Sequence, residues 1–89
     1  MPTISLFFNL RILMYWNDRA PPHFHVGYVG QEADTVIAIR TLEVIEAGSL
    51  KRRALGLALD WAELHTDALL ANWELARQGK PLNTIAPLE

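Results

Sequence analysis

Apolar and polar residues alternate along the first half of the chain, and this period of two predicts β-strands. The expected strands are rich in branched and aromatic residues and cover Leu6–Trp16, His23–Tyr28, Glu32–Ile39 and Val44–Ala47. Turn-forming residues separate them in the segments Asn17–Pro22, Val29-Gly30 and Arg40–Glu43. Because these connections are short, we expect neighbouring strands to pair antiparallel in chain order.

From residue 50 onward the apolar residues follow the period of a helix, at positions 50, 54, 57, 58, 61 and 64. Ser49 precedes this run and can cap the helix. The helical pattern continues to Gln78, and one straight helix of that length would be about 42 Å long at ~1.5 Å per residue. That is long for so small a chain, so we expect a break near His65-Thr66. Gly79 is expected to terminate the second helix, because glycine is favoured at the position just after a helix.

These elements predict one α+β domain over residues 1–89, in which a four-stranded antiparallel meander precedes two C-terminal helices packed on one face. The tail Leu82–Glu89 carries apolar residues that can fold back on the core. The two predicted hairpins also set a register, which places Met14 opposite His25 and His25 opposite Asp34.

This register leaves one face of the sheet without helices. That face would carry His23, His25, Glu32 and Asp34 beside a set of apolar side chains, namely Ile12, Met14, Trp16, Val36, Ala38 and Ile45. Exposed apolar patches of this kind commonly mark interfaces. A homodimer is the simplest way to cover the face, and a second protein is the alternative. The tail or the N-terminal segment could also fold over it.

Composition narrows the classes of function. The chain has 8 Lys and Arg residues against 10 Asp and Glu residues, and the net charge of −2 argues against nucleic acid as a partner without excluding it. The sequence contains no cysteine, which excludes disulfides and thiolate metal sites. Neither a signal-peptide pattern nor an apolar run of ~20 residues is present, so we expect no membrane association and a cytoplasmic location.

His23 and His25 lie two residues apart on a predicted strand and should therefore point to the same side. Neutral imidazoles are good ligands for transition metals, but a complete site needs at least a third ligand. The candidates are Asp34 opposite His25, Asp18 in the adjoining loop and, at a greater distance, Glu32. With only two nitrogen ligands arranged by local geometry, we expect no tightly held metal and no other cofactor.

The histidines have two other interpretations. They could be a structural pair, with His25 held by Asp34 and His23 placed beside Trp16. They could also serve a histidine-dependent nuclease in which Arg19 holds a phosphate. The chain offers no cysteine nucleophile, and its two serines lie in other segments.

The segment Pro21-Pro22-His23-Phe24-His25-Val26, preceded by Tyr15-Trp16-Asn17-Asp18, resembles the signature of the small prokaryotic domain of unknown function 4160 family. The segments Met1–Ser5, Thr41–Val44 and Trp61 through Asn72-Trp73-Glu74 are similar too, so the resemblance covers nearly the whole chain. It implies a small standalone protein of unestablished activity. Such proteins are often encoded beside another small protein, in the manner of toxin–antitoxin pairs, and some are labelled transcriptional regulators. Many members carry a histidine where this chain has Arg19, which removes one candidate nitrogen ligand here.

Together these observations predict a small non-catalytic binding or regulatory protein. We expect it to be one component of a toxin–antitoxin-like or transcription-regulating pair that acts through a protein partner. The expected partner-binding residues are Trp16, Asn17, Asp18, Arg19, His23, His25 and Asp34. The alternative is a metal-dependent or histidine-dependent hydrolase that uses the His23/His25 face, with RNA as a candidate substrate. A DNA-binding regulator is the third class.

Overall fold

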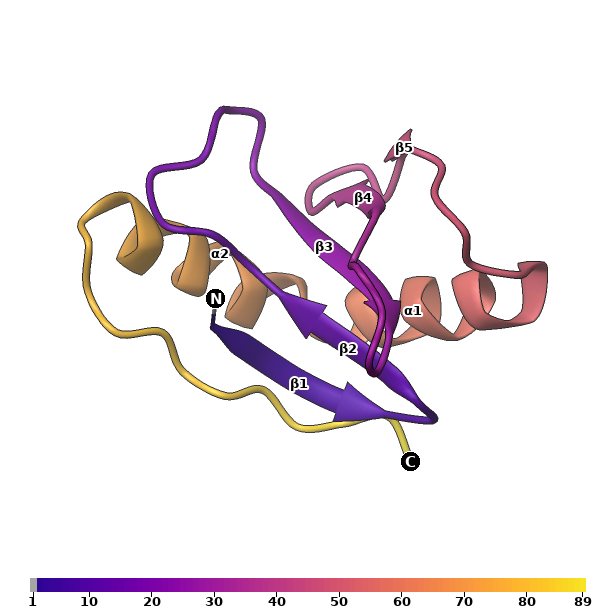
Figure 1. Ribbon diagram of the computed structural model, residues 1–89. Coiled ribbons are helices and arrows are strands. Elements are labelled where there is room, and N and C mark those ends of the chain that lie inside the picture. The colour runs from indigo at the N-terminus through magenta and orange to yellow at the C-terminus, as the bar shows by residue number, and fades with distance from the viewer. Residues whose placement is uncertain (1) are drawn as a thin grey trace.

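The computed structural model describes residues 2–89 and shows an antiparallel sheet followed by two helices (Figure 1). The strands are β1 (Thr3–Phe7), β2 (Leu10–Leu13), β3 (His23–Tyr28), β4 (Thr35–Ala38) and β5 (Val44–Glu46). The helices are α1 (Arg52–Leu64) and α2 (Thr66–Arg77). The strands stand in chain order, with β1 and β5 at the edges, and both helices lie on one side of the sheet (Figure 1). The predicted α+β meander with two C-terminal helices is confirmed, but it has five strands rather than four.

The additional strand comes from the segment that the sequence pattern treats as one strand, Leu6–Trp16. A two-residue hairpin loop at Phe8-Asn9 divides it, with φ angles of 47° and 64°. Such loops need two residues in the left-handed region, where asparagine is well tolerated and phenylalanine is not expected. Because Phe8 is apolar, the pattern conceals the turn, and the N-terminal residues before it become the edge strand β1.

The register of the sheet differs from the predicted one on both sides of β3. Strand β2 pairs Leu13, not Met14, with His25, which is a shift of one residue. Strand β4 pairs Val36, not Asp34, with His25, which is a shift of two. The second shift arises because the connection after Tyr28 is longer than a two-residue turn, so that β4 begins only at Thr35.

The one-residue shift between β2 and β3 changes which side chains meet the helices. Ile12 now pairs with Val26 on the helix side of the sheet. Ile12 and Met14 are both fully buried in the core cluster. The prediction that these two side chains lie on an open face is therefore wrong, and the apolar patch expected there is smaller.

The predicted helix break is confirmed, because α1 ends at Leu64 and α2 begins at Thr66. The second helix ends in a Schellman motif: the N–H of Gly79 donates to Ala76 and that of Lys80 to Leu75, with Gly79 at φ 69°. The first helix begins later than predicted, and Ser49 does not cap it. No helix among residues 2–89 is long and apolar enough to cross a membrane.

The core lies between the sheet and the helices, and Trp61 of α1 is at its centre. Its side chain is fully buried, and its ring centroid lies 5.5 Å from that of Phe7 and 5.9 Å from that of Phe24. The indole Nε1–H donates to the carbonyl of Ala86 at 2.8 Å. Position 61 lies in the apolar period of the predicted helix, and its side chain both fills the core and fixes the C-terminal tail.

The tail folds back on the molecule as predicted. The N–H of Ile85 donates to the carbonyl of Ile4 at 2.7 Å, so the tail runs along β1 (Figure 1). Asn72 of α2 makes two hydrogen bonds of 2.9 Å with the backbone of Asn83. These contacts cover the β1 edge and leave β5 at the other edge of the sheet.

Candidate functional site

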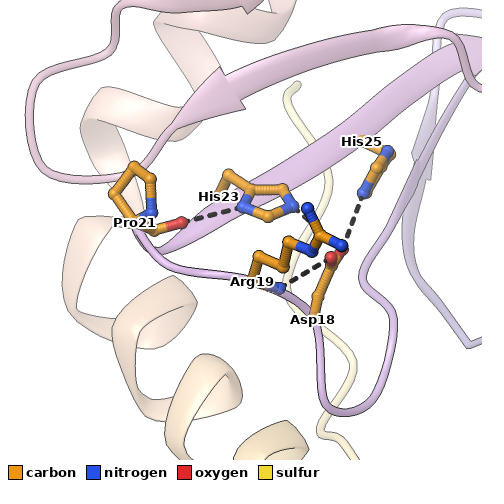
Figure 2. Close-up of polar contacts among 5 residues, drawn as sticks. All are labelled: Asp18, Arg19, Pro21, His23 and His25. Carbon is orange, nitrogen blue, oxygen red and sulfur yellow. Dashed lines mark hydrogen bonds and ion pairs between the residues drawn. The ribbon is translucent and has the colours of Figure 1, made fainter.

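Three side chains from one loop and one strand converge at the start of β3. Oδ2 of Asp18 lies 2.9 Å from Nε2 of His23 and 3.3 Å from Nε2 of His25. Figure 2 shows the two imidazole rings and the carboxylate pointing toward one another. The ring centroids of the two histidines are 5.1 Å apart, which confirms that they share a face of the strand. The sequence pattern predicted this pair and named Asp18 as one of three candidate carboxylate partners, beside Asp34 and Glu32.

Each imidazole ring is held by a second contact. Nδ1 of His23 lies 2.8 Å from the carbonyl oxygen of Pro21, and the ring packs against Trp73 of α2 at 5.1 Å between centroids. The ring of His25 meets that of Tyr15 edge to face at 4.6 Å. A carbonyl oxygen only accepts hydrogen bonds, so Nδ1 of His23 must carry the hydrogen. The Nε2 atom of His23 is therefore directed at Asp18.

The loop that carries Asp18 is tied to the end of α2. The indole Nε1–H of Trp16 donates to the carbonyl of Lys80 at 2.9 Å. The backbone N–H of Asn17, a residue with φ 55°, donates to Ala76 at 3.3 Å. Trp16 and Asn17 were predicted as binding residues, and in the structure their contacts with the end of α2 also position Asp18. Trp73, not Trp16, is the tryptophan beside His23.

The surroundings shift the pKa values of two members of the cluster. Burial raises the pKa of Asp18, but hydrogen bonds from the Arg19 N–H, His25 and His23 outweigh it, and the pKa lies below its ordinary value. Burial lowers the pKa of His25, although the hydrogen bond with Asp18 opposes this change. At neutral pH, Asp18 is therefore a carboxylate and His25 is a neutral imidazole.

The cluster forms one wall of a pocket of about 320 Å³ at the β5 side of the sheet. The pocket is lined by residues of the loop, β3, β4 and β5, namely Asp18, Arg19, Ala20, Pro21, His23, His25, Val36, Ile45 and Glu46. Among residues 2–89, Arg19 makes no ion pair through its side chain. The pocket thus combines imidazole nitrogens, two carboxylates, one guanidinium and apolar walls.

Asp34 does not belong to this site. It accepts hydrogen bonds from the backbone N–H and the hydroxyl of Ser49 at 3.1 and 3.2 Å. The backbone bond from Ser49 lowers the pKa of Asp34. The predicted contact between Asp34 and His25 is wrong because of the two-residue register shift. Asp34 instead holds the segment between β5 and α1, which also explains why Ser49 does not act as a helix cap.

Sequence reasoning missed Glu46 as a member of the pocket. In the observed register His25 lies opposite Val36, and Val36 lies opposite Glu46. Residues opposite one another in neighbouring strands point to the same face, so Glu46 lies on the same side of the sheet as His25. Its negative charge acts to raise the pKa of His25, against the larger lowering by burial. The correct register would have revealed this relation, but the sequence contains no local signal for it.

Comparison with known protein families bears on the same segment. The sequence model of the family described as domain of unknown function (DUF4160) matches residues 9–74, which include Asp18, His23 and His25. The chain belongs to the DUF4160 family. The resemblance seen in the sequence is thereby confirmed at the level of the family. No curated protein and no solved structure matches the chain.

Proposed function

We propose that this DUF4160 protein is a small non-catalytic binding protein that acts through a protein partner, as one component of a toxin–antitoxin-like or transcription-regulating pair. The observation that supports this proposal is a pair of adjoining hollows on the β5 side of the sheet. One is the pocket of about 320 Å³ beside the histidines, and the other has a volume of about 250 Å³. Pro21 and Ile45 line both hollows.

The side chains of this region are suited to contact another protein. Ile45 is 44% exposed between the two hollows, and Pro21 supplies a second apolar wall. Charged side chains surround these walls, with Arg19 and Glu46 in one hollow and Arg40 and Glu43 in the other. An apolar centre within a charged rim is the usual anatomy of a specific interface. The short edge strand β5 crosses this region, and its outer side pairs with no other strand among residues 2–89.

The partner that fits best is a second protein rather than a second copy of this chain. The argument for a homodimer depended on an open face with Ile12 and Met14, and both are buried under the helices. The family resemblance implies a protein encoded beside another small protein, which makes the product of the adjacent gene the first candidate. With a net charge of −2, the chain is poorly suited to bind nucleic acid by charge alone.

We expect Ile45→Asp to weaken capture of the purified product of the adjacent gene by tenfold or more. A charge placed in the centre of an apolar contact removes favourable burial and leaves an ion without a partner. Substitutions at such centres weaken the binding free energy by about 2 kcal/mol or more. The affinity of the two purified proteins can be measured by calorimetry or surface plasmon resonance.

Leu64→Asp is the matched control, because Leu64 is 71% exposed on α1 and does not line either hollow. It should bind the partner as the wild type does. Equal binding by Ile45→Asp and the wild type would contradict the proposal. Sedimentation of the protein alone tests the homodimer. If the wild type is a dimer and Ile45→Asp is a monomer, the partner at this surface is a second copy of the chain rather than a second protein.

A histidine-dependent or metal-dependent hydrolase is the second candidate function, and the convergence of His23 and His25 on Asp18 supports it. A pair of histidines can supply a general base and a general acid. The two functions predict opposite results when the purified protein is incubated with single-stranded RNA. The binding protein leaves the RNA intact. If the wild type cleaves the RNA, and cleavage is lost in His25→Ala but kept in a matched His65→Ala variant, the protein is a hydrolase and the proposal of a non-catalytic binding protein is wrong.

A further inference from the structure

We propose that Asp18, His23 and His25 form a binding site for one divalent transition-metal ion, with open coordination positions that face the pocket. The sequence alone supplied two nitrogen ligands, but the fold adds a carboxylate oxygen. All three donor atoms lie within 4.8 Å of one another. The site serves either function proposed above and depends on neither.

Two of the three distances between the donor atoms already match those of a metal centre. Two ligand atoms at about 2.1 Å from one ion are about 3.0–3.4 Å apart when they subtend the angles of octahedral or tetrahedral coordination. The two distances from Asp18 Oδ2 are 2.9 Å to His23 Nε2 and 3.3 Å to His25 Nε2. Both pairs that include Asp18 therefore already have the separation that one ion requires, and the ligand nitrogens of His23 and His25 lie within 4.8 Å of each other.

The hydrogen bonding of His23 selects the nitrogen that a metal needs. Because Nδ1 donates to the carbonyl of Pro21, a neutral His23 presents the lone pair of Nε2 toward the carboxylate of Asp18. Two lone pairs at 2.9 Å repel unless a positive species lies between them. That species is either a proton on His23 or a metal ion. A carbonyl on the far nitrogen is the usual way in which proteins orient a ligating imidazole.

Different contacts orient the other ligands. Oδ1 of Asp18 accepts the backbone N–H of Arg19 at 2.8 Å, which leaves Oδ2 for the two histidines. The ring of His25 is held by Tyr15, and that of His23 by Trp73. A site in which the supporting contacts exist before the ion arrives loses less side-chain freedom on binding.

The donor set indicates the class of metal. Two imidazole nitrogens and one carboxylate oxygen suit zinc and its neighbours from iron to nickel, whereas calcium and magnesium prefer oxygen ligands alone. Three protein ligands leave at least one position for water or for an outside ligand. The pocket of about 320 Å³ gives that position access to a partner group, and Arg19 and Glu46 stand beside it.

The test is a titration of the untagged protein, freed of metal with a chelator, with zinc chloride in a calorimeter. We expect one zinc ion per chain, with a dissociation constant of about 1 μM or tighter. Asp18→Ala, His23→Ala and His25→Ala should each weaken binding by about 100-fold or more, since each removes one of three ligands. Zinc should also raise the unfolding midpoint of the wild type, because the ion binds the folded chain.

Arg19→Ala is the matched control, because it removes a positive charge from the pocket and leaves all three ligands. It should bind zinc at least as tightly as the wild type. His65→Ala removes a histidine outside the pocket and should leave the affinity unchanged. If the wild type binds no zinc at millimolar concentration, a proton rather than a metal joins the cluster and the proposal is wrong. It is equally wrong if loss of His65 weakens binding as much as loss of His25, or if zinc leaves the unfolding midpoint of the wild type unchanged.

Discussion

Replacing Trp61 with alanine should lower the free energy of unfolding by about 3–5 kcal/mol, the range for the largest buried side chains. The indole is fully buried among aromatic rings of the sheet, and its Nε1–H holds the tail at Ala86. A chain of this size is expected to have a stability of about 5–15 kcal/mol, so the loss is a large share of the whole. Urea unfolding followed by circular dichroism would measure it.

Leu64→Ala is the control for this change, because Leu64 lies on the same helix but is 71% exposed. It should alter the free energy of unfolding by no more than about 0.5 kcal/mol. Trp61→Phe should have an intermediate effect, since it keeps an aromatic ring but loses the hydrogen bond to Ala86. A Trp61→Ala protein as stable as the wild type would show that the core is not organised around this side chain.

Gly27→Ala should destabilise the protein by about 3 kcal/mol, the upper end of the usual range for overpacking. A Cβ atom at this position of β3 would lie 2.6 Å from the carbonyl oxygen of Glu32 and 2.6 Å from the Cα of Ala33. Both are backbone atoms, which cannot rotate away. The guanidinium of Arg11 holds the same loop through the carbonyl of Gln31 at 3.0 Å. Thermal unfolding should show a loss of more than 10 °C, at about 4–8 °C per kcal/mol.

Gly56→Ala is the matched control within the helix α1. A Cβ there would meet nothing within 4 Å. Alanine should instead stabilise the protein by up to about 1 kcal/mol, because glycine is a poor helix former. If Gly27→Ala and Gly56→Ala shifted the unfolding midpoint in the same direction, this would contradict the conclusion that the loop packs too closely against β3 to admit a side chain at residue 27.

The sequence predicted the elements whose signals are local. The helical period, the expected length limit and Gly79 together located both ends of the second helix, and the break at His65-Thr66 followed from length alone. The tail could be placed on the core because Ile85 and its apolar neighbours would otherwise be exposed. These predictions needed no knowledge of which strand pairs with which.

The register could not be predicted, because it depends on the length of each connection. Phe8-Asn9 adopts a turn that its apolar first residue conceals. Val29-Gly30 does form the predicted tight turn, closed by the N–H of Gln31 donating to the carbonyl of Tyr28 at 3.0 Å, but the loop continues to residue 34. A shift of one residue was enough to move Ile12 from the expected open face into the core. The apolar patch and the homodimer argument depended on that register.

The candidate site was predicted in part for the same reason. His23 and His25 share a face because of the period of a strand, which is a local property. Their carboxylate comes from Asp18, whose position depends on the contact between Asn17 and the end of α2. Asp34 was chosen from the predicted register and lies elsewhere. The chemistry of the site thus follows from tertiary contacts that the sequence pattern does not encode.

The most direct measurement of the central claim, that Asp18, His23 and His25 form one ligand-binding site, uses the three histidines of the unmodified chain. Their ring nitrogens can be followed by NMR while zinc chloride is added to the metal-free protein. The Nε2 signals of His23 and His25 should change together and stop changing at one equivalent, while those of His65, beside Trp61, stay in place. Equal changes in all three histidines, or none in His23 and His25, would contradict the account.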